Sequence, residues 1–536
     1  MTRRPRDRST DPGTPMRSAH DRDDPATPLY PAAPVRERSQ KLRADADTTE
    51  LSRKRRILIL GICCTSLLLV SLDSTILNVA LPVMQRDLGA SLSGMQWTVD
   101  AYTLVLASLL MVAGSAADRV GRRKVFTMGL ITFSLGSALC SVAPDLRTMI
   151  LFRVLQAIGG SMLNPVAMSI ITTTFTVPRQ RARAIGVWGS VFGLAMAAGP
   201  LLGGLLVDTV GWRAVFLINI PVGVIALWAT LRHIPESRAP APRRPDPIGQ
   251  LLVTGLLGTV TYAIIEAPGK GWTSAEILAC LVSATVSLLG LLGYESRRDE
   301  PLLDLRFFRS APFSGAVVIA VAGFVVLGGF LFLNTLYLQN VRGLDALHAG
   351  LYLLPMAAFM LISPPASSRL IASYGPRSSL VLSGAAMALG SVLFAACDAE
   401  ESRPLLFLGY CLLGIGVGMV NAPITNTAVS GMPLSQAGVA SAVATTSRQV
   451  GQALGVAVIG AVLAHGTRNV TGAAYPDTFA DAARPAWWVI TGCGVAVLLV
   501  GAATSGRWAQ RSAERTARLL AETGAAGPAR GASSHP

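Results

Sequence analysis

Fourteen long apolar stretches recur along this chain of 536 residues, and they restrict its fold more than any other feature. A helix needs about 20 apolar residues to cross a bilayer. In lipid every backbone polar group must be bonded within the protein, so we interpret these stretches as helices rather than strands. The fold class predicted is therefore an all-α polytopic membrane protein. The expected spans are 57–81, 97–117, 125–143, 147–172, 184–207, 213–232, 248–267, 275–293, 313–337, 348–366, 379–397, 405–430, 437–464 and 486–504.

The net charge of +15 raises the alternative of a nucleic-acid-binding protein. However, the basic residues are distributed unevenly about the expected spans. With the N-terminus inside the cell, the cytoplasmic segments hold 36 of the 46 Lys and Arg residues, and the external loops hold eight. This asymmetry is typical of membrane proteins. We therefore expect a multi-pass protein of the cell membrane, with both termini in the cytoplasm and no nucleic-acid partner.

Two polar segments flank the expected spans. Residues 1–56 hold 14 basic and nine acidic residues and no apolar run. Such a segment cannot bury enough apolar surface to fold alone. We therefore expect a disordered cytoplasmic tail over 1–56 and a second cytoplasmic tail over 507–536.

The sequence signatures of several other protein classes are missing. No phosphate-binding loop of the Gly-x-x-x-x-Gly-Lys-Ser/Thr type occurs, which argues against ATP as the energy source. The five His residues are scattered, and the seven Cys residues show neither metal-ligand nor disulfide spacing. A membrane enzyme or sensor would need a catalytic constellation or a folded soluble domain. We therefore expect no enzyme activity, no metal and no cofactor.

A weak internal repeat relates the two halves of the chain. A basic turn follows the second span, and Arg369, Gly375 and Arg377 form a degraded copy of it after the tenth span. The repeat predicts two related six-helix bundles with two further spans inserted between them. Transporters built from repeats place their substrate site between the repeats, near the middle of the bilayer. The expected segments are a first bundle over 57–232, a linker with the inserted spans over 233–300 and a second bundle over 301–506.

The first span contains an acidic residue at depth. Asp73 lies eight residues from the outer end of this span, which is about 12 Å at 1.5 Å per residue. Arg153 lies six residues into the fourth span, about 9 Å deep by the same rise. The two residues are therefore level to within one helical turn. Ionisable groups at such depth are costly and usually functional.

These two residues suggest a mechanism of proton coupling. Withdrawal from water favours the protonated form of a carboxyl group, whereas a nearby guanidinium favours its charged form. A rearrangement that changes the Asp73–Arg153 distance would therefore load or release a proton. A structural ion pair is the alternative. Asp100 follows Trp97 in the second span, nearer the outer mouth, and is a further candidate for coupling or substrate binding, with a water-facing position as its alternative.

Two other ionisable residues lie in or near later spans. Arg448 falls near the middle of the thirteenth span, with Ser447 and Gln449 beside it. It either lines the central cavity or neutralises facing carbonyl groups, and the sequence does not decide between these. Glu266 falls at the outer end of the seventh span, where we expect a solvated interface residue.

The turn after the second span has the ordered spacing Gly-x-x-x-Asp-Arg-x-Gly-Arg-Arg. An ordinary cytoplasmic turn would also be basic, but this ordered spacing is much rarer. Gly permits a tight chain reversal, and the acidic residue can pair with basic groups across the cytoplasmic face. We predict a gate that holds the inner side closed. Its residues are Gly114, Asp118, Arg119, Gly121, Arg122 and Arg123.

The fifth span combines several Gly residues with a Pro. Small residues let helix backbones approach closely in lipid, and Pro kinks a helix by removing a hydrogen bond. We expect tight packing that seals the interface between the bundles and limits leak, with generic small-residue packing as the alternative. The residues concerned are Gly186, Gly199, Pro200, Gly203 and Gly204.

These motifs resemble those of the major facilitator superfamily, and in particular of its fourteen-span drug:proton antiporter branch. The turn from Gly114 to Lys124 is similar to the signature that follows the family's second span. The resemblance covers about residues 55–506. Further similar stretches are 72–82, 96–102, Trp212-Arg213 with Asn219-Ile220-Pro221, Gln339 with Gly343, Gly350 with Pro355, and 448–451.

The resemblance also implies roles for individual motifs. The stretch from Arg153 to Gly160 is similar to a fourth-span motif whose arginine is tied to proton transfer. The fifth span is similar to an antiporter motif that accompanies export, although Ala195 replaces one expected glycine. The second-half turn lacks the acidic residue of its partner, which implies a looser second gate.

The resemblance implies a function for the chain. This function is that of a proton-coupled antiporter that exports small hydrophobic or amphipathic drugs or antibiotics by alternating access. Asp73 and Asp100 match acidic positions associated with cationic substrates or coupling, whereas the thirteenth span carries Arg448 and no acid, unlike many relatives with multiply cationic substrates. The composition resembles that of actinobacterial proteins, which often export a self-made antibiotic. An exporter of an endogenous metabolite or siderophore is the alternative. The expected partners are the substrate, protons and the bilayer, and the protein is expected to be a monomer.

Overall fold

The computed structural model describes residues 52–239, 246–298, 304–396, 403–430, 432, 437–467 and 475–525. The chain separates into two units, and every helix described below belongs to the second, Arg53–Pro536. Most of the tail predicted over 1–56 lies outside the described residues. Its last residues, from Arg53, belong to the first helix, which begins four residues before the predicted start of the span.

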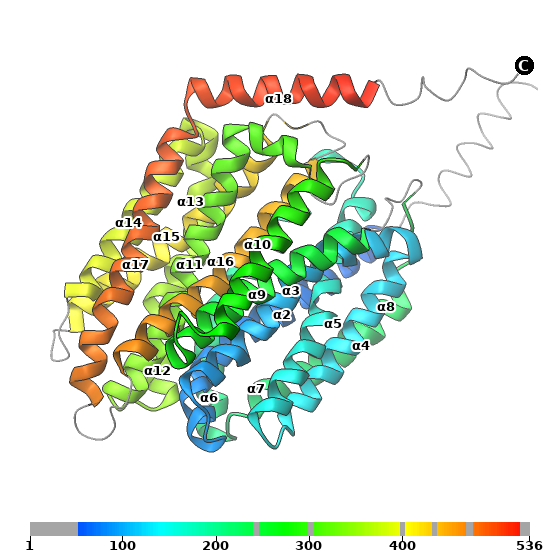
Figure 1. The fold of residues 1–536 in the computed structure, drawn as a ribbon. Helices are drawn as coiled ribbons and strands as arrows, with labels where there is room; N and C mark the ends of the chain where they lie inside the picture. Colours follow the sequence, from blue (N-terminus) through cyan, green and yellow to red (C-terminus); the bar gives the residue numbers. More distant parts are fainter. Residues whose placement is uncertain are drawn as a thin grey trace, which may run out of the picture. The chain divides into compact units, whose positions relative to one another are not determined.

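The first bundle contains α2 to α8 within the described residues (Figure 1). Helix α2 packs against α6, and α5 packs against both α3 and α4. The hydroxyl of Ser91 and the carboxylate of Asp145 cap the N-termini of α3 and α5 by accepting backbone N–H groups. The bounds are α2 (Arg53–Asp87), α3 (Leu92–Val120), α4 (Arg122–Ser141), α5 (Leu146–Thr174), α6 (Pro178–Thr209), α7 (Ala214–Leu217) and α8 (Asn219–His233).

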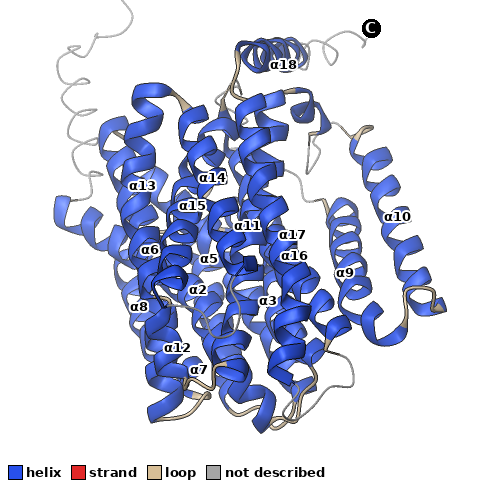
Figure 2. Cartoon of the chain, turned by 90° about the vertical axis from the view of Figure 1, so that its left-hand side faces the viewer, coloured by secondary structure: helices blue, strands red, loops and turns tan. Residues whose placement is uncertain are grey.

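Two inserted helices, α9 (Pro247–Lys270) and α10 (Ala275–Glu295), form a hairpin at one side of the molecule (Figure 2). Helix α9 contacts α3 of the first bundle and α16 of the second. Side chains of α10 such as Val282, Val286 and Leu289 are largely exposed. An apolar face of this kind is suited to contact with lipid.

The second bundle surrounds α11, whose side chains are almost all buried from Ala316 onward. Helices α15, α16 and α17 pack against it. Helices α12 and α13 are bent by 42° at a break around Leu353, and Pro355 occupies the first turn of α13, where its missing N–H is tolerated. The bounds are η1 (Leu305–Arg309), α11 (Ala311–Leu336), η2 (Tyr337–Val341), α12 (Ala346–Tyr352), α13 (Leu354–Tyr374), α14 (Pro376–Ala396), α15 (Arg403–Val429), α16 (Ala437–Gly466) and α17 (Tyr475–Ala503).

The chain reverses between spans at glycines with positive φ. Gly121 and Gly375 mark reversals at one end of the molecule, hereafter the Gly121 end. Gly343 and Gly211 mark reversals at the opposite end, hereafter the Gly343 end, where α7 and α12 lie (Figure 1). Only Gly adopts such φ values without steric cost, so the reversals depend on it.

In the described residues, thirteen helices are long and apolar enough to cross a membrane, or up to fourteen if the bent pair α12–α13 counts as one span. This agrees with the fourteen predicted spans. The largest boundary error is at α17, which begins at Tyr475, eleven residues before the predicted start of the last span. Its first turns carry Asp481 and Arg484, 3.5 Å apart, and these charges hide the helix start from a search for apolar runs.

The segment predicted as a C-terminal tail contains a further helix, α18 (Arg507–Ala525). This helix lies across the ends of the spans rather than along them (Figures 1 and 2). It packs against α11 and η1, and the Ser512 hydroxyl accepts the backbone N–H of Ala311 at 2.9 Å. Ala509 and Leu520 are buried, whereas Trp508 is exposed, so the helix is amphipathic.

Candidate functional site

A buried ion pair joins α2 to α5. Nη1 of Arg153 donates to Oδ2 of Asp73 at 2.7 Å, and each side chain is only 1% exposed. The two residues that the sequence analysis placed at the same depth are therefore in direct contact. Charges withdrawn from water require such pairing, because an isolated buried charge costs several kcal/mol.

Two amides complete the coordination of the Asp73 carboxylate. Nε2 of Gln156 donates to Oδ1 at 2.8 Å, and Nδ2 of Asn219 donates to the same oxygen at 3.1 Å. Both amides also donate to the Ser137 hydroxyl. Neither amide was predicted from the sequence as a site residue. Gln156 lies three residues after Arg153, so helical spacing would have placed it on the same face of α5.

The Arg153 guanidinium has further partners that hold its orientation. Its Nε donates to the backbone oxygen of Thr98 at 3.2 Å, and Nη1 also donates to Oε1 of Gln156 at 2.7 Å. The guanidinium lies over the Tyr102 ring, 4.1 Å from its centroid, in a cation–π arrangement. The pair is therefore embedded in a network that spans α2, α3, α4, α5 and α8.

Asp100 lies apart from this network. Its side chain is fully buried, and within the described part of the chain neither carboxylate oxygen has a hydrogen-bond partner. One helical turn earlier on α3, Gln96 donates to the backbone oxygens of Val456 and Ala457 on α16. Spacing of four residues puts Asp100 on this same face of α3. The alternative of a water-facing Asp100 is therefore wrong.

Arg448 lies in the second bundle, separate from the Asp73 pair. Its guanidinium donates to the hydroxyls of Thr425 and Thr445 at 3.2 and 2.8 Å. The Glu266 side chain is partly exposed, at 21%, and its carboxylate accepts the Trp97 indole N–H at 2.9 Å. This bond attaches α9 to α3.

The glycines of α6 allow close packing on two sides. A methyl group at Gly199 would overlap Thr75 of α2, and one at Gly203 would lie 2.8 Å from the Ile76 oxygen. On the other side, a methyl group at Gly204 would lie 2.5 Å from the Ala346 oxygen on α12. The region around Pro200 thus contacts both bundles, as the sequence analysis expected.

Gly186 does not take part in this packing. It is exposed, and a methyl group there would meet no atom within 4 Å. The expectation of tight packing is therefore wrong at this position. The reason is its location near the start of α6, about 20 Å along the helix from Gly199 at 1.5 Å per residue, where α2 is not in contact with it.

The basic turn at the Gly121 end is held within its own bundle. Asp118 pairs with Arg122 at 2.8 Å, and Arg123 donates to the Leu231 oxygen of α8. Gly121, with φ +126°, lies against the Glu236 carboxylate, and Arg119 is exposed. Gly114 approaches α5 less closely, since a methyl group there would lie 3.7 Å from Pro165.

Contacts between the two bundles gather at the Gly343 end. Nε2 of Gln339 donates to the Val79 oxygen on α2 at 2.8 Å. The Asp208 carboxylate at the end of α6 accepts the backbone N–H of Leu347 on α12 at 2.7 Å. Between the bundles lies a narrow apolar cavity whose lining residues come from α2, α6, α11 and α13, and they are Thr75, Met196, Pro200, Leu327, Leu331, Leu353, Met356, Ala357 and Met360.

Among the described residues, no group of three or more His, Cys, Asp or Glu side chains is arranged to hold a metal ion. The functional groups that the site offers are a carboxylate, a guanidinium and two amides.

The family of this chain follows from sequence comparison. Residues 63–456 match the model of the Major Facilitator Superfamily. The chain belongs to this superfamily. Its members are membrane transporters, so the protein is a multi-pass transporter and not an enzyme. The sequence prediction of the family is thereby confirmed.

The relatives that the chain resembles are proteins of antibiotic and drug resistance. It is 38% identical to the tetracenomycin C resistance and export protein of Streptomyces glaucescens, over 78% of this chain and 77% of the relative. It is 36% identical to the multidrug resistance protein Stp of Mycobacterium tuberculosis, over 74% of each chain. It is also 36% identical to the puromycin resistance protein pur8 of Streptomyces alboniger, over 74% of this chain and 79% of the relative.

Solved structures of other transporters share the fold of this chain. A bacterial homolog of the human lysosomal transporter Spinster, in an inward-facing and occupied conformation, superposes with a TM-score of 0.59 at 18% identity, covering 87% of this chain and 98% of the other. A structure from the proton-dependent oligopeptide transporters gives a TM-score of 0.57 at 14% identity, covering 87% and 100%. At these identities the likeness shows the fold alone.

Proposed function

We propose that this transporter is a proton-coupled antiporter that exports small hydrophobic or amphipathic drugs or antibiotics and thereby confers resistance. The observation that carries the proposal is the Asp73–Arg153 pair, a titratable group buried between two spans. Intramembrane ionisable residues commonly mark proton relays. The resistance and export proteins to which the chain is similar support drugs as the substrate class.

The contacts of Asp73 support proton coupling. In the present conformation its carboxylate accepts three hydrogen bonds, one of them from the Arg153 guanidinium. A movement of α2 relative to α5 that withdraws Arg153 would leave the carboxylate buried without its cationic partner, and a buried charge without a partner is costly. A proton would then take the place of the guanidinium and would leave when the pair forms again.

Helix α2 connects this proton site to the contacts between the bundles. Thr75 and Ile76 lie against the α6 glycines, and the Val79 oxygen binds Gln339 of the second bundle. Asp73 and Val79 are six residues apart, about 9 Å along the helix. Rocking of the bundles that breaks the contact at Val79 therefore acts on the same helix that carries Asp73.

The apolar cavity measures about 10 Å³ in the present conformation, room for about one water molecule, and we propose that it widens to admit a substrate when the bundles rock. Met196, Met356 and Met360 line it, and flexible thioether side chains adapt to apolar molecules of different shapes. We propose that Asp100 and Arg448 add polar selectivity on the two sides of the path. The unpartnered carboxylate of Asp100 would take a proton or the cationic group of a substrate.

We further propose that the Gly121 end faces the cytoplasm, together with both termini, because the basic turns lie there. The contacts at the Gly343 end would then close the site toward the outside, as in an inward-facing state. The basic turn around Asp118 would serve as the inner gate when the bundles rock. We also propose that the first bundle ends at residue 232 and that the second bundle extends from 301 to 506. The protein is proposed to be a monomer.

The test is drug susceptibility in a host that lacks its own efflux pumps. Cells that express the protein should tolerate more of at least one compound in a panel that includes puromycin and tetracenomycin C, and a proton uncoupler should remove the difference. Asp73→Asn should abolish the tolerance. Asp87→Asn is the matched control, because this carboxylate lies at the exposed end of the same helix. Transport by Asp73→Asn at an undiminished and pH-independent rate would refute the proposal.

A further inference from the structure

The basic turn of the second half differs in charge from that of the first. In the first half, Asp118 neutralises Arg122 across 2.8 Å. In the second half, Arg377 follows Gly375 at the corresponding reversal between α13 and α14, and no acidic residue accompanies it. The Arg377 side chain is exposed, and no hydrogen bond or ion pair joins it to another described residue. Its positive charge is therefore available to an external anion.

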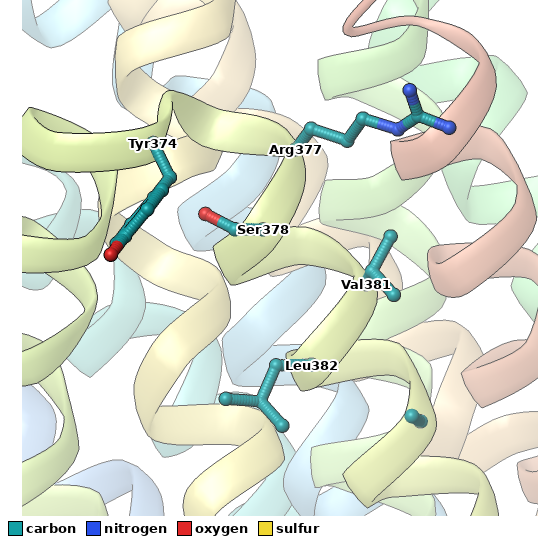
Figure 3. Close-up of a pocket in the computed structure, with 6 residues that line it drawn as sticks. Tyr374, Arg377, Ser378, Val381 and Leu382 are labelled. Carbon is teal, nitrogen blue, oxygen red and sulfur yellow. The ribbon is translucent and has the colours of Figure 1, made fainter.

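This arginine lies at the edge of a groove on the surface of α13 and α14 (Figure 3). Figure 3 shows Arg377 and Ser378 near the reversal, with Val381 and Leu382 farther along α14. Tyr374 projects from the end of α13, and its hydroxyl points away from the Arg377 guanidinium. Ala385 completes the wall one turn beyond Val381. The groove is thus polar at the end of the span and apolar along it.

The apolar part of the groove continues into a surface suited to lipid. Leu382 is 47% exposed and Leu389, two turns farther along α14, is 59% exposed. Tyr374 is 76% exposed at the opposite, polar end. Aromatic residues with a polar tip are enriched at the boundary between the headgroups and the acyl chains. The groove therefore crosses this boundary, with its cationic end on the headgroup side.

We propose that this groove binds a single anionic phospholipid. The phosphate lies at Arg377, and one acyl chain runs along Val381 and Leu382. A free phosphate ion would use the arginine but none of the apolar wall. A neutral lipid would use the wall but would not need a cation. The proposal is independent of the proton-coupled export proposed above.

The experiment is a titration of the purified full-length protein in detergent with phosphatidylglycerol, followed by native mass spectrometry. Arg377→Ala should weaken binding roughly fivefold, the effect of about one basic residue near an anionic headgroup. Arg377→Lys should retain most of the binding. Leu382→Gln should weaken binding of phosphatidylglycerol without creating a preference for phosphatidylcholine.

Controls separate this site from general surface charge. Arg297→Ala removes an exposed arginine at the same end of the molecule, outside the groove, and should leave binding unchanged. Equal binding to the wild type and to Arg377→Ala would overturn the proposal. An equal loss in Arg297→Ala would also overturn it, because diffuse charge would then suffice. Displacement of the lipid by inorganic phosphate alone would identify an anion site without a lipid.

Discussion

The ion pair between Asp73 and Arg153 predicts strong energetic coupling. Both side chains are almost completely buried, so removing one partner leaves the other charge without compensation. Asp73→Asn and Arg153→Met should each lower the free energy of unfolding by about 3–5 kcal/mol. The Asp73→Asn cost should lie near the lower limit, because Arg153 keeps its bonds to Thr98 and Gln156 and its contact with Tyr102.

The double variant should cost much less than the sum of the single variants. With both charges removed, neither is left buried and unpaired, and replacement of a buried pair by neutral groups is often close to neutral. The coupling free energy should therefore reach at least about 3 kcal/mol, the upper end of the range for residues in contact. Unfolding of the four proteins in mixed micelles, followed by circular dichroism, measures it.

A surface pair whose carboxylate lies on the same helix, α2, provides the matched control. Arg213 and Asp87 lie 3.0 Å apart, with side chains 44% and 48% exposed. Exposed pairs are worth about 0–1 kcal/mol, so Asp87→Asn with Arg213→Met should show little coupling. Additivity within about 0.5 kcal/mol for Asp73 and Arg153 would refute the reasoning, because the pair would then behave as if solvated.

Three further predictions concern packing and pH. Gly199→Ala should destabilise the protein by about 1–3 kcal/mol through overlap with α2, whereas Gly186→Ala, in open space, should be neutral or stabilising by up to about 1 kcal/mol; thermal unfolding of both variants checks this. Gly204→Val should hold α6 and α12 apart, which spin-label distances at the Gly343 end would detect. Hydrogen bonds from the backbone and ring of His348 lower the pKa of Asp345, so its contribution to stability should be present above about pH 4 and lost as the pH falls through this lowered value. Asp345→Asn should remove that acid-dependent loss in unfolding measured as a function of pH.

The spans were predictable because the bilayer imposes a simple local rule. A run of about 20 apolar residues is sufficient to identify a helix, and thirteen or fourteen such helices are present in the described residues. The rule fails where a helix extends beyond the apolar layer. The first turns of α17 carry charges and were missed, and α18 is amphipathic and too polar to be recognised as a span.

The candidate site was predictable in part. Counting residues from the membrane surface placed Asp73 and Arg153 at the same depth, because helical rise is constant. The amides of Gln156 and Asn219 were not found, since a neutral polar residue in a span carries no comparable signal of cost. Gly186 and Gly199 look alike in a motif, yet only Gly199 lies where two helices meet.

The sequence by itself determined that this chain is a bundle of membrane-spanning helices, in which a carboxylate and a guanidinium lie at one depth. Hydrophobicity and helical rise are local properties, so they can be read from residue order. Only the tertiary structure decided which helix faces which, and therefore that two amides join the pair while Asp100 stays unpartnered within the described residues. The rotation of each helix about its axis depends on contacts with distant segments, and no single segment of sequence contains that information.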